Sequence, residues 1–492
     1  MASVFTEILG ELARQEPTAT AVIDELGGVS LEQFNAEIDA VAFEVARSHT
    51  DRVAVIASNS ARFLVHVFGV WRAGRTAVTI YPSSPGAEIA YALDHSEVGL
   101  VFADEAAAAK IPDGRPVVLL DRDLPHNSDY SPETVDPRED ALICYTSGST
   151  QRPKAVLHSH ASVLQGAQAY AKVWHLGPRD TTLVVLPMAW AFGLVTTSMA
   201  GLVSGGRIRS VRRAHPEAVI DAINGSGVTF VAGVTTVFAK LVTALNTGSR
   251  LDAPSLRLCI SGGEPRHEGV FTEWRRLTGV PVHDVYAASE CFPVVTYDPL
   301  LDPEPVAGYA GRIVEGSELQ LWDEESATLA PGPGIGEAFV RGGAFFSCYQ
   351  GDPELTDKAR TADGWYRTGD IVEVRDDGLV RVLGRLSGMI IRGGANVAPA
   401  EVERAIRDLD DVDDVVVLGV PDAVYGQRIV ALVRGFDGRA PDVEAVLEHC
   451  RQQLAGYKVP SEVIVTGDFP VNDRTGKIDR RLLESQLTGG AQ

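Results

Sequence analysis

The sequence predicts an α/β protein: a large N-terminal domain of layered parallel sheets with a small β-barrel-like part, followed by a smaller α+β C-terminal domain. Three observations lead to this fold class. The chain has 492 residues, more than one ordinary hydrophobic core can organise, so at least two domains are expected. Its first half alternates short β-branched runs with helical patterns. From about residue 334 onward, alternating strands and hairpin turns replace that arrangement.

The first half is expected to form parallel sheets covered by helices. Buried strands are predicted at 183–186, 228–231 and 256–260, because each is a short apolar run rich in β-branched residues. Helical patterns lie between or beside these strands at 160–173, 193–203, 235–246 and 267–277. Strands that alternate with helices in this way are typical of α/β layers.

The second half contains shorter units. A strand is predicted at 335–341, and two strands at 372–382 flank the turn Asp376-Asp377-Gly378. A helix at 399–409 has proline near its first turn and glutamates close to its positive end. Strands at 415–420, 429–433 and 462–466 and helices at 441–454 and 479–487 complete the chain. The domain boundary is predicted at about 385–388.

Composition excludes several classes of function. The formal net charge is −22, and the acidic residues are spread along the chain, which disfavours nucleic-acid binding. The chain has no apolar stretch of about 18 residues, as a membrane span would require, and its N-terminus has no signal-peptide pattern. The five cysteines form no C-x-x-C pair, so neither disulfides nor a zinc site are expected. These features predict a cytoplasmic protein.

A loop of small hydroxyl residues carries the clearest chemical signal. The apolar run at 141–145 leads into Thr-Ser-Gly-Ser-Thr-Gln-Arg-Pro, and Lys154 closes the loop. Backbone N–H groups and hydroxyls can surround phosphate oxygens, while a lysine supplies a positive charge. The loop is not the G-x-x-x-x-G-K-[ST] type, because no glycine precedes the lysine. The candidate phosphate ligands are Thr146, Ser147, Gly148, Ser149, Thr150 and Lys154.

This segment resembles the phosphate-binding signature of the adenylate-forming superfamily, Y-T-S-G-[ST]-T-G-x-P-K-G. That superfamily contains acyl- and aryl-CoA synthetases, the adenylation domains of peptide synthetases, and beetle luciferases. Other segments resemble its further motifs, in the expected order, between about residues 140 and 480. The resemblance is closest to the acid–CoA ligase branch. It implies an enzyme that uses ATP and Mg²⁺, with coenzyme A as the acceptor substrate.

Two segments resemble the adenine-binding motifs of the superfamily. The sequence Ser-Gly-Gly-Glu-Pro at 261–265 is similar to its adenine-side loop and supplies Gly262, Gly263 and Glu264. The segment 284–290 resembles its Y-G-x-T-E motif. The resemblance implies that Tyr286 packs on the adenine and that Asp284 accepts a hydrogen bond from the adenine amino group. A flat base is well matched by an aromatic face.

The same resemblance assigns roles to polar residues around the phosphates and the ribose. It implies that Ser289 bonds the α-phosphate and that Glu290 holds Mg²⁺, a cation that prefers carboxylate oxygen. Asp370, in Tyr-Arg-Thr-Gly-Asp at 366–370, and Arg385, in Gly-Arg, should reach the ribose. Lys477 is the expected catalytic lysine, which would stabilise charge at the α-phosphorus.

The C-terminal segment resembles the acid–CoA ligase form of the superfamily. The resemblance implies a large adenylation domain at 1–385, which binds ATP and the acid, and a small mobile domain at 386–492, which carries the catalytic lysine. Ser387 would be the hinge between them. The paired Gly393 and Gly394 leave room for a slender thiol arm, because a backbone without Cβ permits close approach.

The acid is expected to have a neutral tail. The resemblance places the acyl pocket in the segments 187–194, 230–238 and 262–290. No acidic residue occurs between Asp180 and Glu217, so an ammonium group in the substrate would be buried without a partner. Aromatic, alicyclic or medium-length aliphatic acids are predicted, unless the aromatic residues belong to the core and the pocket is narrower. The candidate acid-binding residues are Trp190, Phe192, Phe230, Val234, Gly262 and Ala287.

The sequence departs from the superfamily patterns at several positions. Gln151, Ala155 and Ala287 stand where glycines are usual. Trp190 replaces the more usual histidine or other aromatic residue, and Ser387 replaces a charged hinge residue. These departures leave adenylation well supported and affect the second half-reaction more.

Three functions are compatible with these features. The first is an acid–CoA ligase that forms acyl-AMP and then the CoA thioester. The second is an adenylation enzyme that delivers the acyl group to a carrier protein or a separate partner enzyme. The third, a nucleotide-binding protein without turnover, is disfavoured by the retained charged residues of the motifs. The sequence leaves the choice between monomer and homodimer open.

Overall fold

The computed structural model describes residues 4–125, 127, 130–132, 134–146, 153–264, 266–323, 326, 328–392, 395–422, 424–436, 439–471 and 478–489. The chain divides into two compact units. The first comprises residues 1–320, 339–367 and 377–380, and the second comprises residues 321–338, 368–376 and 381–492. Four strands span the points where the chain passes from one unit to the other: β16 (Ser317–Asp323), β18 (Gly334–Gly342), β20 (Tyr366–Val374) and β21 (Val380–Arg385), and β17 (Thr328–Ala330) lies within the second unit.

A nine-stranded sheet is the larger of two sheets in the described part of the first unit, with order β15-β14-β13-β12-β11-β9-β10-β1-β2. From β13 to β1 in this order, each strand pairs in parallel with the next. Strands β14 and β15 at one edge and β2 at the other add antiparallel pairs. The strands are β1 (Thr20–Asp24), β2 (Gly27–Ser30), β9 (Thr181–Val184), β10 (Arg207–Ser210), β11 (Phe230–Gly233), β12 (Leu258–Gly262), β13 (Val282–Ala288), β14 (Cys291–Thr296) and β15 (Arg312–Ile313).

The second sheet of this unit has seven described strands in the order β19-β8-β7-β4-β3-β5-β6. Its β7-β4-β3-β5-β6 part is parallel, whereas β8 runs antiparallel to both β7 and β19. The strands are β3 (Arg52–Ile56), β4 (Thr76–Thr79), β5 (Leu100–Ala103), β6 (Val117–Leu119), β7 (Asp140–Thr146), β8 (Lys154–Ser159) and β19 (Cys348–Tyr349).

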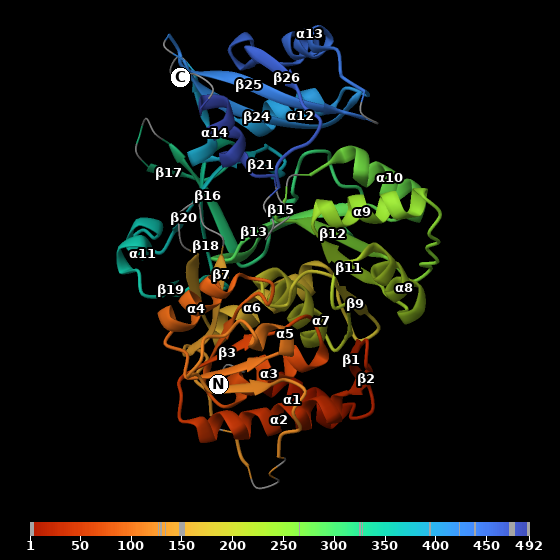
Figure 1. Ribbon diagram of the computed structural model, residues 1–492, viewed down its shortest axis with the longest axis vertical. Coiled ribbons are helices and arrows are strands. Elements are labelled where there is room, and N and C mark those ends of the chain that lie inside the picture. The colour runs from red at the N-terminus through yellow and green to blue at the C-terminus, as the bar shows by residue number, and fades with distance from the viewer. Residues whose placement is uncertain are drawn as a thin grey trace. The chain divides into compact units, whose positions relative to one another are not determined.

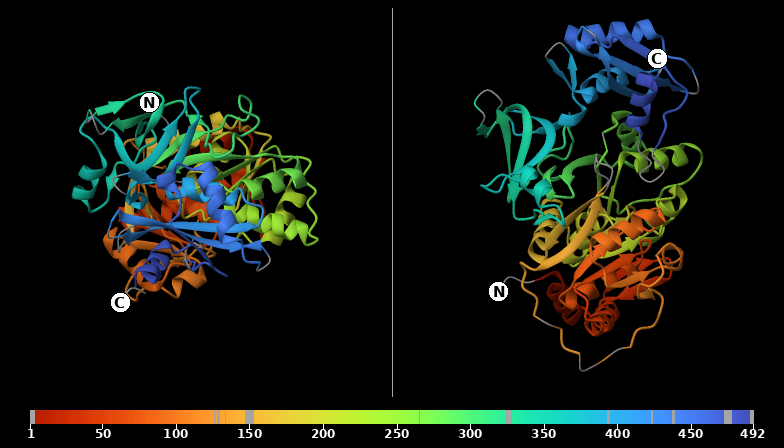
Figure 2. Two further views of the ribbon diagram at one scale, coloured as in Figure 1. Left: turned by 90° about the horizontal axis from the view of Figure 1, so that it is seen from above. Right: turned by 60° about the vertical axis from the view of Figure 1, so that its left-hand side comes forward.

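Helices cover the sheets of the first unit, as Figures 1 and 2 show. Helix α6 (His160–Val173) contacts β7, β8 and β14 and thus lies between the two sheets. Helices α8 (Pro216–Ser226), α9 (Thr235–Asn246) and α10 (Glu268–Thr278) pack on the other face of the large sheet. The further helices are α1 (Phe5–Gln15), α2 (Leu31–Ser48), α3 (Ala61–Arg72), α4 (Gly86–His95), α5 (Glu105–Ala108), α7 (Ala200–Val203) and α11 (Pro353–Ala359).

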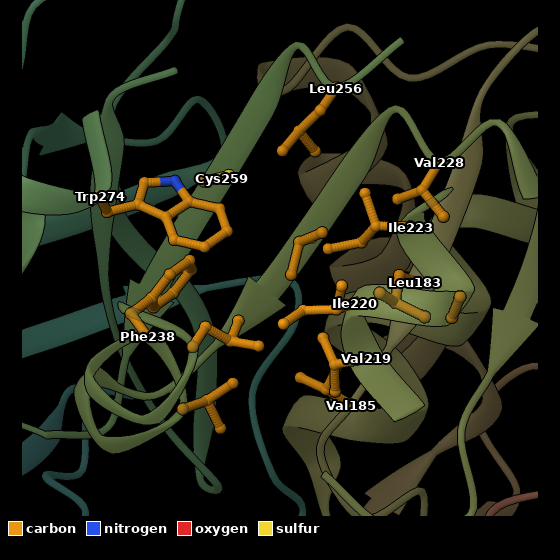
Figure 3. Packing of buried hydrophobic residues seen from close by; sticks show 14 of the residues in the cluster. Leu183, Val185, Val219, Ile220, Ile223, Val228, Phe238, Leu256, Cys259 and Trp274 are labelled. Atoms are coloured by element: carbon orange, nitrogen blue, oxygen red, sulfur yellow. The ribbon is translucent and has the colours of Figure 1, made fainter. Parts of the chain in front are cut away.

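An apolar cluster fixes helices α8, α9 and α10 on the large sheet (Figure 3). Phe238 of α9 meets Trp274 of α10 edge-on, with ring centroids 5.3 Å apart. Ile220 and Ile223 of α8 fill the space over β9 and β11. Their spacing of three residues is that of one helix face, so the buried cluster accounts for the helical pattern in the sequence.

The predicted helix at 193–203 takes a different form. Residues Phe192–Met199 form a π-helix, and only Ala200–Val203 continue as α7. The hydroxyls of Thr197 and Ser198 both donate to the Gly193 carbonyl at 2.7 Å. Hydroxyls that bond to carbonyls one turn earlier compete with the regular backbone ladder. A wide π-turn of this kind frequently occurs at functional sites.

The second unit contains a smaller sheet with its own core. Its strand order is β23-β22-β25-β24, and β26 pairs with β25. Apolar side chains of β24, β25, α12 and α13 pack together. The elements are β22 (Ile390–Arg392), β23 (Ala395–Val397), α12 (Pro399–Arg407), β24 (Val412–Asp422), β25 (Gly426–Gly435), α13 (Val443–Gln453), β26 (Glu462–Val465) and α14 (Arg480–Gly489).

The predicted fold class is confirmed: a large α/β part with layered sheets precedes a smaller α+β part. Most predicted elements recur within about two residues, as for helices α6 and α9. Across the described residues, no helix is both long enough and apolar enough to cross a membrane.

Buried histidines predict a loss of stability in acid. Burial lowers the pKa of His66, His158 and His160 from 6.5 to about 4. Because the unfolded chain binds these protons more readily, the stability they contribute is complete above pH 6.5 and is lost as the pH falls towards 4. We expect roughly 3 kcal/mol of destabilisation for each histidine, measured as a falling urea midpoint.

Asp284 changes the pH dependence of stability in the opposite direction from the histidines. Burial raises the pKa of Asp284 to about 6, so its folded form takes up a proton first and gains stability as the pH falls below 6. One aspartate does not offset three histidines. A His66→Gln protein should show a weaker pH dependence, and a urea midpoint that stays constant between pH 7 and 4 in the unmodified protein would contradict the prediction.

Candidate active site

The turn at Ser289 and Glu290 joins strands β13 and β14 and holds a buried carboxylate. Ala288 and Cys291 pair on either side of this turn. The Glu290 side chain accepts a hydrogen bond from the Tyr349 hydroxyl at 2.7 Å, and its carbonyl accepts from the Phe346 N–H at 2.9 Å. Only 8% of Glu290 is exposed. The carboxylate is therefore held in one place by partners from a distant segment of the chain.

Tyr349 links this carboxylate to a lysine. The Lys154 ammonium lies 5.0 Å from the centre of the Tyr349 ring, within the range of a cation–π contact. Burial, followed by the Glu290 carboxylate, raises the pKa of the Tyr349 hydroxyl, which also hydrogen-bonds to Tyr366. The phenol thus remains a neutral donor. The structure brings Lys154 and Glu290, both predicted site residues, to the same tyrosine.

The phosphate-loop segment begins and ends at one pair of residues. Thr146 at the end of β7 pairs with Lys154 at the start of β8. The predicted phosphate ligands between them, Ser147, Gly148, Ser149 and Thr150, lie outside the described residues, as do Gly393, Gly394 and Lys477. The described ends of the loop place Lys154 at the start of β8, paired with Thr146 at the end of β7.

Strand β8 also contacts the Ser289 backbone. The buried His158 ring lies with Nε2 2.7 Å from the Ser289 carbonyl oxygen and with Nδ1 2.9 Å from the Ser162 hydroxyl. A carbonyl oxygen only accepts, so Nε2 carries the proton and Nδ1 accepts from the serine. The sequence analysis did not select His158. Its signal is a polar residue in an apolar strand, on the same face as Lys154 by the two-residue period.

The predicted adenine-side residues gather at the ends of β12 and β13. These strands are parallel neighbours, with Gly262 opposite Val285. Gly263 has φ +76°, a conformation that suits glycine. The Glu264 carboxylate accepts from the N–H and the hydroxyl of Thr236 at 2.9 and 2.8 Å, so it caps the first turn of α9. Ligands commonly bind where parallel strands end in this way.

Asp284 is buried and forms an ion pair that the sequence analysis did not anticipate. Arg266 donates to its carboxylate at 2.8 Å and to Glu268 at 2.6 Å. The half-buried Tyr286 lies two residues further along β13. Arg266 follows the glycine loop without any distinguishing pattern around it. Its role becomes visible only when β12 and β13 are neighbours.

The candidate acid-binding residues divide into an accessible and a buried set. Phe192 and Gly262 are adjacent: a Cβ on Gly262 would lie 3.3 Å from the Phe192 ring. Trp190 lies against the Tyr81 ring at 5.3 Å and, like Val234 and Ala287, is partly exposed. Phe230, by contrast, has no exposed surface and packs on the Trp174 ring.

The second unit brings together the predicted ribose ligands. The Arg385 Nε lies 2.7 Å from the Asp370 carboxylate, and Arg385 also donates to the Thr368 carbonyl at 2.9 Å. Gly369 between them has φ +70°, which turns the chain so that both groups meet. Ser387, the predicted hinge, lies in a short 3₁₀ turn at Leu386–Gly388.

The available carboxylate ligands suit a magnesium ion better than a metal ion that is coordinated entirely by protein side chains. The described residues contain no cluster of three or more histidine, cysteine, aspartate or glutamate side chains placed to hold a metal. Mg²⁺ usually takes one or two carboxylates and completes its shell with substrate phosphates and water. Glu290 beside the phosphate-loop hairpin meets that requirement.

Comparison with known proteins decides the family. Residues 9–350 match the model of the AMP-binding enzymes, and residues 401–477 match the model of the AMP-binding enzyme C-terminal domain. The chain belongs to the AMP-binding enzyme family. The resemblance to the adenylate-forming superfamily is therefore confirmed, in agreement with the predicted use of ATP.

Similar proteins share nearly the whole length of this AMP-binding enzyme. A mitochondrial malonate–CoA ligase of Xenopus laevis is 29% identical over 94% of this chain and 89% of its own. An indoleacetate–CoA ligase of Aromatoleum aromaticum is 28% identical over 95% of each. The crystal structure of ATP-bound MatB from Rhodopseudomonas palustris has a TM-score of 0.87 at 25% identity, covering 99% of this chain and 100% of that one.

Removing the Tyr349 hydroxyl should destabilise the first unit. The Tyr349→Phe change leaves the buried Glu290 carboxylate without this donor, so the free energy of unfolding should fall by about 1–3 kcal/mol. A urea titration that follows the unfolding of the first unit measures this free energy. Glu290→Gln is the companion variant, because its amide oxygen still accepts from Tyr349 and should preserve more stability. Equal stability of the unmodified and Tyr349→Phe proteins would contradict the expectation.

Proposed function

We propose that this AMP-binding enzyme activates a carboxylic acid with a neutral tail as its acyl-adenylate and then transfers the acyl group to the thiol of coenzyme A. The observation that carries the proposal is the grouping of Lys154, Tyr349 and Glu290 beside the phosphate-loop hairpin. Phosphate binding needs a positive charge and a ligand for the metal ion. The lysine supplies the charge and the carboxylate supplies the metal ligand. The family match and two relatives named as CoA ligases add support.

Each half-reaction forms one bond and breaks one. A carboxylate oxygen of the acid attacks the α-phosphorus of ATP, and pyrophosphate leaves. Bound Mg²⁺ supplies neutralising charge to the phosphates. Lys154 and the hydroxyl loop hold the phosphates, Ser289 donates to the α-phosphate, and Lys477 stabilises the charge that develops at phosphorus. The CoA sulfur then attacks the acyl carbon, and AMP leaves.

The proposal assigns the remaining residues to the nucleotide and the thiol. Asp370 and Arg385 hold the ribose, an assignment supported by their mutual 2.7 Å contact. Residues 1–385 act as the adenylation domain, and residues 386–492 act as the mobile domain with Ser387 as hinge. Gly393 and Gly394 admit the pantetheine arm of CoA. A carrier protein or a partner enzyme as acceptor is the alternative that the acceptor assay below distinguishes.

A neutral tail is favoured because two of the three proposed pocket segments lack charge. Residues 186–206 and 228–239 contain no aspartate, glutamate, lysine or arginine. Arg266, four residues after Gly262 in the third segment, is already bonded to Asp284 and Glu268. A second carboxylate, as in the malonate used by one relative, would be buried without a cation at a cost of several kcal/mol.

The decisive assay measures acid-dependent pyrophosphate release with aromatic, alicyclic and aliphatic monoacids and with malonate, each with and without CoA. We expect release with at least one monoacid, faster turnover and an acyl-CoA product when CoA is present, and no release with malonate. Release that CoA does not change, with acyl-AMP retained on the protein, would replace CoA by a protein acceptor. Preference for malonate would overturn the neutral-tail assignment.

A second test concerns the proposed catalytic lysine. Lys477→Ala should lower the adenylation kcat by a factor of about 10² or more, because it removes charge stabilisation at the reacting phosphorus. The matched control is Lys172→Ala, which removes an equally long cation from an exposed ion pair with Glu315. If both variants keep the same kcat, Lys477 is not catalytic.

A further inference from the structure

One face of strand β8 carries both Lys154 and His158, and the His158 ring reaches the Ser289 carbonyl. Lys154, Val156 and His158 alternate along β8 and point to the same side. Val156 pairs with Tyr349 across β8 and β19, so the tyrosine that bonds Glu290 shares this face. The turn is thus held from one face of two paired strands, through Tyr349 of β19 and through His158 of β8.

The two contacts hold different parts of the turn. Tyr349 bonds the Glu290 side chain, whereas His158 bonds the Ser289 backbone carbonyl. The Tyr349 contact does not orient the peptide between Ser289 and Glu290, and the Phe346 N–H bonds the carbonyl of the peptide that follows it. A hydrogen bond to the carbonyl fixes the orientation of the peptide between Ser289 and Glu290, and with it the direction in which the next N–H and both side chains leave the turn.

The His158 ring is itself held on three sides. Its Nδ1 accepts from Ser162, whose N–H is capped by Ser159 at the start of α6. The Phe292 ring lies against it with centroids 4.8 Å apart. Phe292 is confined in turn by Gly166 of α6, where a Cβ would come within 2.6 Å of the ring. The imidazole can neither rotate nor exchange its tautomer without losing a contact.

We propose that His158 is a positioning residue of adenylation: its imidazole ties the strand that begins at Lys154 to the Ser289 carbonyl and so aligns the Ser289–Glu290 turn with the phosphate-binding lysine. This inference rests on the proposed function. His158 touches no reacting atom and donates no proton to substrate. It sets the geometry in which Ser289 and Glu290 meet Mg·ATP.

The test compares two amides of different reach. In His158→Gln the amide nitrogen occupies the region of Nε2 and still donates to Ser289, whereas in His158→Asn it reaches only the region of Nδ1. Both variants lose the ring and its contact with Phe292, so they should be destabilised alike. We expect kcat/KM for Mg·ATP in pyrophosphate release to fall by about tenfold or more in His158→Asn, because misplacement of binding groups slows the reaction steeply. In His158→Gln it should stay within about threefold of the unmodified protein.

His66→Leu provides the control for a purely structural histidine. His66 is also buried and also bonded to a backbone carbonyl, that of Arg62 at 2.7 Å, but it lies in α3. Its substitution should lower thermal stability without changing kcat/KM at a temperature where the protein is folded. Equal losses of kcat/KM in the Gln and Asn variants, or no loss in either, would overturn the proposal.

Two further experiments test the role of His158 if a variant does not fold or if the proposed function is wrong. If the His158→Asn protein does not accumulate, Ser162→Ala removes the partner of Nδ1 and should lower kcat/KM in the same direction; unchanged kcat/KM there would also count against His158. If none of the tested acids causes the unmodified protein to release pyrophosphate, the proposed function fails. The role of His158 is then judged by calorimetric affinity for Mg·ATP in the same variants, where equal affinities of the Gln and Asn proteins would overturn it.

Discussion

The hydrogen bonding of β8 to strands on both sides is the constraint on which the site depends. β7 fixes Lys154 at the end of the phosphate-loop segment, and β19 fixes Tyr349 opposite Val156. Because the two pairings share one strand, an antiparallel ladder sets the register of residues almost two hundred positions apart. A slip of one residue would turn Lys154 and His158 to the other face of the sheet and separate them from Glu290.

A strongly acidic protein binds a polyanion here by giving its buried carboxylates local partners. Glu290 receives the Tyr349 hydroxyl, Asp284 receives Arg266, and Asp370 receives Arg385. Each partner belongs to one carboxylate, so these negative charges are offset locally, the first two within the first unit and the third within the second. For Glu290–Tyr349 and Asp284–Arg266, burial of both partners keeps the interaction strong, because little water screens it.

The sequence was sufficient for the fold class and for most of the motif residues, because helices and strands leave periodic patterns and motifs keep their order along the chain. It was insufficient where the relevant partner is distant. Tyr349 appears in the sequence as one of several aromatic residues, and Arg266 as an ordinary charge after a glycine loop. Only the pairing of β19 with β8, and of β12 with β13, reveals what they bond. The π-helix was equally hidden, although the Thr197 and Ser198 hydroxyls that both bond to the Gly193 carbonyl accompany it.

The π-helix has a consequence for how the proposed acid-binding segment can change. A helix advances by about 100° for each residue, since a turn holds 3.6 residues. The wide turn at Phe192–Met199 accommodates more chain than an α-turn would. The number of residues in this stretch therefore sets the direction of the Phe192 ring as firmly as any neighbouring side chain. Insertion or deletion of a single residue in this stretch would therefore turn the Phe192 ring in a way that a point substitution would not.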